Sequence, residues 1–300
     1  MLRQSLPWIA LFYMGSVWGL SFSLGKIATS LGGTPIGIAF WSSLISGLLL
    51  LIFTTARGRP MWITSSNLML FIILALLGTA IPSVCFYYAA SKIPAGVLAI
   101  TVTLVPILTY AFATILKIEV LSVRRITGIL FGTLAIILLV VPDTSLPDQK
   151  AVIWILVACL SSVCYASENI ILAKRSLTGI GPVRLACGMS LIGACILGIT
   201  GYFTNNLFII SIPFDQLTWT ILGLSIINAT AYTLFVFTIT RSGPLFASQV
   251  GYLVTLSGIF WGILLFGENN SVWIWSSLAM MLLGLALVSP KKKILKSVKT

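Results

Sequence analysis

The sequence is poor in charged residues and contains no histidine. Charged side chains make up 8% of the 300 residues against 58% hydrophobic ones, and the mean hydropathy is +1.10. A soluble domain carries roughly 25% charged residues, because its surface must be hydrated. This scarcity excludes a water-soluble enzyme. With no histidine and only six Asp and Glu, histidine-based acid–base chemistry and His-rich metal sites are excluded as well.

The cysteines show no pattern of a metal or disulfide site. No Cys-x-x-Cys pair occurs, and all five lie inside apolar runs, at Cys85, Cys159, Cys164, Cys187 and Cys195. Free cysteine in such a setting commonly packs as a small apolar residue. We therefore expect no disulfide and no metal.

The apolar residues form long runs instead of an amphipathic pattern. A helix needs about 20 residues to cross the hydrocarbon core, and runs this long span lipid as helices. The sequence therefore predicts an all-α integral membrane protein with no separate extramembrane domain. The ten predicted transmembrane helices lie near residues 7–29, 35–55, 67–90, 95–116, 122–141, 151–173, 182–204, 217–240, 245–266 and 271–289.

Lysine and arginine are distributed unevenly between the two sides of this arrangement. With a cytoplasmic N-terminus, fifteen of them face the cytoplasm, and Lys26, Lys92 and Lys150 face outward. Basic residues accumulate in cytoplasmic loops, so both termini are predicted to be cytoplasmic. The net charge of +12 is scattered at helix ends and predicts contact with the lipid bilayer, not with nucleic acid. The basic tail 291–299 is a stop-transfer anchor or a contact for anionic lipid.

The chain carries a weak internal repeat at an offset of 146 to 149 residues. Segments 35–45 and 182–192 match at Pro, Ala and Ser-Leu-Ile, and Glu119 matches Glu268. Each half holds five predicted spans, an odd number, so the second half must enter the membrane in the opposite sense. We therefore predict two inverted five-helix repeats, 1–146 and 147–300. Such repeats are typical of transporters that hold substrate near the midplane between them.

Two blocks of sequence resemble a known family. The motif Trp18-Gly19-x-x-Phe22 and the block from Gly243-Pro244 to Gly267-Glu268 resemble the EamA group of the drug/metabolite transporter superfamily. The resemblance covers essentially the whole chain. It implies a 5+5 inverted-repeat fold in a bacterial inner membrane, usually exporting amino acids or other small metabolites. Thr255 stands where this group often has proline in the ninth span.

Glu168 is the carboxylate predicted to lie within the membrane. It falls in the sixth span, six residues before Lys174. A carboxylate at this depth is costly and normally faces the bundle interior or a wet cavity. We expect it to act as a counter-charge for a cationic or amino-bearing substrate, or as a proton-coupling group. The alternative is a structural ion pair, or a side chain that snorkels towards the cytoplasmic interface.

Aromatic and polar side chains on other spans are predicted to line a cavity with Glu168. Aromatic faces beside a carboxylate suit an ammonium or guanidinium group through cation–π attraction. Each aromatic taken alone is equally well explained by packing, and the serines by helix association. The predicted substrate or coupling residues are Glu168, Trp18, Tyr165, Tyr232, Tyr252, Asn228, Gln249 and Ser23. Pro82 and Pro106 each remove a helix hydrogen bond and are predicted kinks or hinges.

The other five carboxylates are expected at membrane faces. Glu119 and Glu268 are repeat mates, and each is predicted to cap the N-terminus of the helix that follows it. Asp143, Asp148 and Asp215 fall in outer loops, where they are solvated.

Together these features predict a transporter that works by alternating access and exports an amino-acid-like or amino-bearing small metabolite. Transport of quaternary amines or drugs is the alternative. The sequence has no phosphate-binding loop, nucleophile elbow or catalytic carboxylate pair, so we expect neither an enzyme nor a cofactor, and a lipid-modifying enzyme or a scaffold is disfavoured. Transport is then driven by protons or another coupling ion, or is facilitated. A monomer and a homodimer both remain open.

Overall fold

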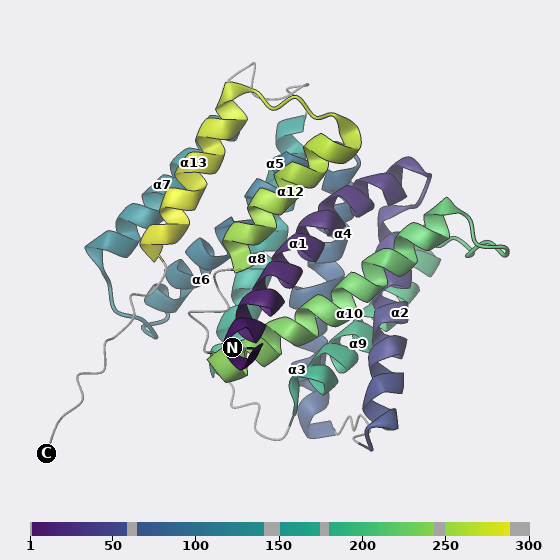
Figure 1. Ribbon diagram of the computed structural model, residues 1–300. Coiled ribbons are helices and arrows are strands. Elements are labelled where there is room, and N and C mark those ends of the chain that lie inside the picture. The colour runs from purple at the N-terminus through teal and green to yellow at the C-terminus, as the bar shows by residue number, and fades with distance from the viewer. Residues whose placement is uncertain (1, 59–64, 141–150, 175–179, 243–249, 289–300) are drawn as a thin grey trace, which may run out of the picture.

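The computed structural model describes residues 2–58, 65–140, 151–174, 180–242 and 250–288 (Figure 1). All regular structure in these ranges is helical. The elements are α1 Leu2–Ser30, α2 Pro35–Ala56, α3 Ser65–Ala75, the π-helix η1 Leu76–Ala80, α4 Ile81–Ala90, α5 Ala95–Val102, α6 Leu104–Ile115, α7 Val123–Val140, α8 Val152–Lys174, α9 Pro182–Phe203, α10 Gln216–Ser242, α12 Val250–Phe266 and α13 Val272–Val288.

Seven stretches of the described chain are long and apolar enough to cross a membrane. They are Trp8–Ser30, Pro35–Ala56, Leu68–Ala90, Ala95–Ile115, Val152–Leu172, Pro182–Phe203 and Gln216–Phe235. The predicted fifth, ninth and tenth spans coincide with α7, α12 and α13, and the last two are apolar helices of 17 residues each. The all-α membrane fold is therefore present, and the full number of ten crossings stays a prediction.

Helix packing is reciprocal between the two halves of the chain. α2 packs on α9 and α7 on α13, and Figure 1 shows the α7–α13 pair side by side at one edge of the bundle. α1 packs on α12 and α10. Its counterpart in the second half, α8, packs on α5 and α6, which correspond to α12, and on α4 and η1, which correspond to α10. Each contact that α1 makes with the second half therefore has a corresponding contact between α8 and the first half.

The interior of the bundle is apolar, and so is much of its outer surface. The largest buried cluster joins side chains of α1, α5, α8 and α13, among them Met14, Leu98, Ile155 and Met281. Large apolar side chains such as Phe12 and Phe260 are exposed on the outside. A soluble monomer rarely exposes so much apolar surface, whereas lipid tails solvate it without cost.

Two spans are interrupted next to the predicted proline kinks. The third span contains η1, which ends one residue before α4 and two before Pro82. The fourth span breaks at Thr103, between α5 and α6, three residues before Pro106. Proline has no amide hydrogen to donate to the carbonyl four residues earlier, which for Pro106 is that of Val102. The interruptions lie where hinges were predicted, and their movement remains a proposal.

α10 begins with a carboxylate cap. The Thr218 amide donates to Asp215 Oδ1 over 2.8 Å and the Thr218 hydroxyl over 2.6 Å, while the Ser211 hydroxyl donates to Oδ2 over 3.2 Å. This pattern satisfies a free amide at the helix N-terminus. The hydrogen bonds from Thr218 lower the pKa of Asp215 below its ordinary value of 3.8.

Replacing Asp215 by asparagine is expected to lower thermal stability at neutral pH, and the difference from the parent should depend on pH. Because folding lowers the pKa of Asp215, its stabilising contribution is complete above the unfolded pKa and is lost as pH falls through the lower folded pKa. Melting temperatures in detergent should differ by a constant amount from pH 8 down to about pH 5 and converge below about pH 4. A difference that persists unchanged below pH 4 would contradict this assignment.

Candidate functional site

Glu168 lies inside the helix bundle, on the face of α8 that packs against η1 and that Tyr232 of α10 reaches. Its exposed fraction is 4%. The Tyr232 hydroxyl of α10 donates to Glu168 Oε1 over 3.1 Å and also lies 3.7 Å from Met189 Sδ of α9. The carboxyl group therefore sits where helices from both halves of the chain meet.

Gly78 allows this close approach. A Cβ atom built on Gly78 would lie 2.5 Å from both Cδ and Oε1 of Glu168, and 2.6 Å from Oε2. Any side chain at position 78 would therefore displace the carboxyl group. Gly78 is the central residue of η1, and π-helical turns inside α-helices occur frequently at functional sites. Gly78 was not among the site residues predicted from sequence. Its only signal was a glycine inside the third apolar run, four residues before Pro82.

The ion pairs of the described residues do not involve Glu168. They join Lys26 to Glu268 and Arg125 to Glu119. The structural ion pair considered as an alternative is thus not seen in the part of the chain that the structure describes. What holds the Glu168 carboxyl there is a neutral hydroxyl and the packing of η1.

Of the predicted aromatic residues, Tyr232 and Tyr165 lie near Glu168, and Trp18 contacts a position farther along α10. Tyr165 precedes it by one turn on α8 and is half-buried. Trp18 of α1 packs edge-on against Phe235 of α10, with ring centroids 5.6 Å apart, and Phe235 follows Tyr232 by three residues. The structure therefore brings Glu168, Tyr165 and Tyr232 together and places Trp18 against the next turn of α10.

The remaining predicted residues lie elsewhere. Ser23 of α1 is fully buried, and its hydroxyl has no hydrogen-bond partner among the described residues. Asn228 is exposed on α10. Tyr252 lines a groove of about 1100 Å³ between α1 and α12 together with Phe12 and Ser16. Gln249 lies outside the described residues.

A second hollow, of about 330 Å³, lies between α6 and α8. It is lined by Phe112, Ser167 and Ile171 among others. Neither this hollow nor the groove at Tyr252 is lined by Glu168. No cluster of three Cys, Asp or Glu side chains that could hold a metal occurs in the described ranges.

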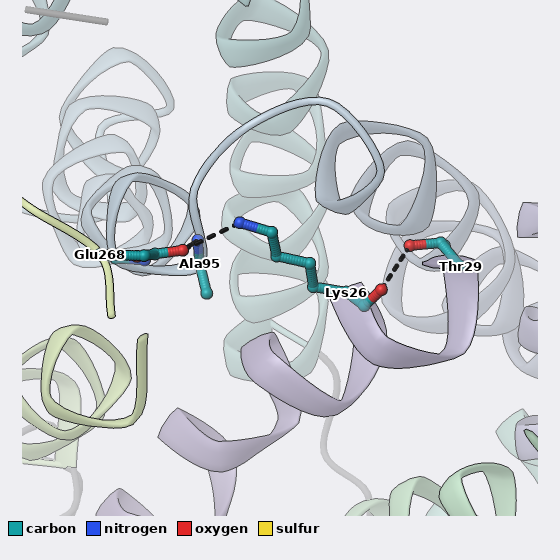
Figure 2. Close-up of polar contacts among 5 residues, drawn as sticks. Lys26, Thr29, Ala95 and Glu268 are labelled. Carbon is teal, nitrogen blue, oxygen red and sulfur yellow. Dashed lines mark hydrogen bonds and ion pairs between the residues drawn. The ribbon is translucent and has the colours of Figure 1, made fainter. Parts of the chain in front are cut away.

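Glu268 forms a second polar cluster, at the end of the bundle where α1 ends and α5 begins. Lys26 Nζ donates to Glu268 Oε1 over 2.9 Å, and the Ala95 amide donates to the same atom over 2.7 Å (Figure 2). The Gly96 amide donates to Oε2 over 3.1 Å. Glu268 was expected to cap the helix that follows it, α13, but it caps α5 instead. Residues 95 and 268 are too distant in the chain for local spacing to reveal this contact.

Glu119, the repeat mate of Glu268, is held locally. It accepts a hydrogen bond from Arg125 Nη1 over 3.0 Å, and 51% of its side chain is exposed. The two mates therefore occupy different environments in this structure.

Comparison with known proteins gives one family and a fold. A family model described as the EamA-like transporter family matches residues 6–141 and again 152–289. Seventeen chains of solved structures match. One, described only as the crystal structure of a protein, is 18% identical with a TM-score of 0.63, over 93% of this chain and 96% of that one. At that identity the likeness concerns the fold alone. No curated protein matches.

Proposed function

The chain belongs to the EamA-like transporter family, and we propose that it is a secondary or facilitative transporter that exports an amino-bearing small metabolite by alternating access. The family and the apolar helices make it a multi-pass membrane protein of a transporter class. We place it in an inner membrane with both termini in the cytoplasm. The Glu268 end of the bundle then faces outward.

The observation that carries the choice of substrate is the Glu168 carboxyl group. It is buried, it is held by a neutral hydroxyl, and helices of both halves surround it. A buried carboxylate requires a compensating charge or a proton. An ammonium group of the substrate supplies that charge, and a proton supplies it when the substrate is absent. This exchange gives the same residue a role in binding and in coupling.

The hydrogen-bonding capacity of Glu168 favours a primary or secondary ammonium over a quaternary one. A carboxylate accepts N–H bonds that become shorter and stronger when the donor is charged, and a quaternary amine has no hydrogen to donate. Tyr165 and Tyr232 still offer aromatic faces, which keeps quaternary amines and drugs as the alternative substrates.

Alternating access is supported by the reciprocal packing of the two halves. When counterpart helices make counterpart contacts, two conformations of nearly equal energy arise by exchanging the roles of the repeats, each open to one side. One example is the contact of α1 with α12, which corresponds to the contact of α8 with α5 and α6.

Counterflow in proteoliposomes tests the proposed function. Vesicles that contain the purified protein and an excess of one unlabelled compound should accumulate the labelled form when that compound is a substrate. We expect accumulation for at least one amino acid or amine, and thermal stabilisation by the same compound. Choline and cationic drugs form the comparison panel. Stabilisation and exchange confined to quaternary compounds would support the alternative, and exchange confined to anionic metabolites would contradict both.

A further inference from the structure

We propose that Glu268 is a positioning residue that locks α5 onto α12 and α1 when the outer side is closed, and that it releases α5 when that side opens. The inference rests on the proposed alternating-access function. It concerns a site 100 residues away in sequence from Glu168, and it does not depend on which substrate is carried.

The carboxylate of Glu268 ties together three segments that are distant in sequence. It lies in the link between α12 and α13 and accepts hydrogen bonds from Lys26 of α1 and from Ala95 and Gly96, the first residues of α5. Figure 2 shows Lys26 reaching from α1 to Glu268 beside Ala95. Only 8% of the Glu268 side chain is exposed. The first amides of a helix carry partial positive charge and have no partner within the helix. Glu268 supplies that partner for α5, and Lys26 balances its charge.

Glycines of α12 allow α5 to lie close beneath this contact. A Cβ on Gly262 would lie 2.5 Å from Glu268 Oε2 and 3.3 Å from the Gly96 nitrogen. A Cβ on Gly258 would lie 2.5 Å from Ala99 Cβ. Small residues four apart are a common device for close helix approach in membranes. Here they permit the carboxylate to reach the α5 amides.

α5 has the form of a short movable element. It is eight residues long and ends at the break in the fourth span. Thr103, at this break, shares a hydrogen bond with Thr255 of α12. Pro106 leaves the Val102 carbonyl without its usual helical donor. Rotation about this break would lift the Ala95 end of α5 away from α12 while the Thr103 end stays in contact.

Glu119, the repeat mate of Glu268, is held within its own segment. Glu119 is half exposed, and the hydrogen bond described for it comes from Arg125, six residues along the chain. Alternating access requires that the two faces are not open together and that the repeats exchange roles. At the outer face, Glu268 joins three segments. At the inner face, Glu119 is held by a nearby residue. This difference is expected when the outer side is closed.

Accessibility of Thr101 from outside tests the lock. Thr101 lies near the inner end of α5 and is fully buried. A Thr101→Cys reporter is placed in a chain whose accessible cysteines, Cys85, Cys159 and Cys195, are replaced by alanine. The protein without the reporter gives the background. Labelling by a membrane-impermeant maleimide from the outer side should be slow in the parent. Glu268→Ala should raise the rate about tenfold or more, because it removes hydrogen bonds to a charged group. Lys26→Met should raise it less.

Asp215→Asn is the matched control. It neutralises a carboxylate at the same face that caps one helix without joining distant segments, so labelling of the Thr101→Cys reporter should stay at the parent rate. Glu268→Asp should restore slow labelling in part, which loss of folding alone would not produce. Unchanged labelling in Glu268→Ala, with a parental melting temperature, would overturn the proposal.

Two further variants test the lock by the same labelling measurement if Glu268→Ala fails to fold. Lys26→Met leaves the α5 cap in place, and Gly262→Ala puts a methyl group against the carboxylate. Both should increase labelling, and parental labelling in both would also overturn the lock. Counterflow separates this result from the proposed function. Increased labelling without exchange of any amine would retain the lock and reject the substrate assignment, whereas amine exchange with unchanged labelling would do the reverse.

Discussion

Replacing Glu168 by glutamine is expected to reduce amine counterflow to a small fraction of the parent rate. Glutamine has a similar size and can still accept the hydrogen bond from Tyr232, but it can neither balance an ammonium charge nor exchange a proton. An ammonium group left unpaired in a buried site costs about 3 kcal/mol or more, which corresponds to roughly a 100-fold loss of affinity. Initial rates of counterflow over a range of substrate concentrations measure this loss.

Two further variants define what the Glu168 result means. Tyr232→Phe keeps the ring and removes the hydroxyl that donates to Glu168, so exchange should weaken by about tenfold, the value of one hydrogen bond to a charged group. Asp215→Asn changes a carboxylate that caps α10 outside the substrate site and should leave exchange close to the parent at a temperature at which both proteins are folded. Full exchange with an unchanged pH dependence in Glu168→Gln would reject both roles of this residue. Exchange that persists but no longer responds to a pH gradient would assign it to coupling alone.

A single methyl group at position 78 is expected to impair transport nearly as strongly. Because a Cβ on Gly78 would lie 2.5 Å from the Glu168 carboxyl group, Gly78→Ala must move either Glu168 or η1. Such overpacking costs about 1–3 kcal/mol, which exceeds the gain of about 1 kcal/mol or less from replacing glycine by alanine in a helix. We expect at least a tenfold loss of counterflow and a lower melting temperature.

Gly223→Ala is the control for this substitution. Its nearest contact would be Leu24 Cδ1 at 3.5 Å, an ordinary van der Waals distance, so neither exchange nor stability should fall. The double variant Gly78→Ala with Glu168→Gln should be no worse in exchange than Glu168→Gln alone, because both act on one group. Additive losses, or equal behaviour of the two alanine variants, would show that the close approach at Gly78 has no role in transport.

The position of Glu168 could be anticipated from sequence because its cause is local. A carboxylate in an apolar run must turn away from lipid, and helical spacing alone then places Tyr165 on the same side. The membrane class followed from composition, because long apolar runs and scarce charge are properties of the sequence alone. Pro106 likewise indicated an interruption in the fourth span, since a missing amide acts wherever the helix lies.

The contacts that depend on how helices cross could not be anticipated. Gly78 matters because η1 crosses α8 at the carboxyl group, and Glu268 matters because the α12–α13 link lies over the first amides of α5. Neither crossing is encoded by nearby residues. Spacing also failed to distinguish Asn228, which is exposed on α10, from Tyr232, one turn along the same helix. The direction in which a side chain meets its neighbours is decided by tertiary packing.

The reciprocal packing of the two halves has a consequence for biogenesis. The most extensive helix contacts, those of α2 with α9, α7 with α13 and α1 with α12, all join an early helix to a late one. During synthesis, the early helices therefore lie in the bilayer without these partners until the late helices are inserted. Until then, they contact only lipid and one another. We therefore expect the first half on its own to be an incomplete folding unit. Two fragments divided between α7 and α8 and produced together should still assemble, because the junction carries none of these contacts.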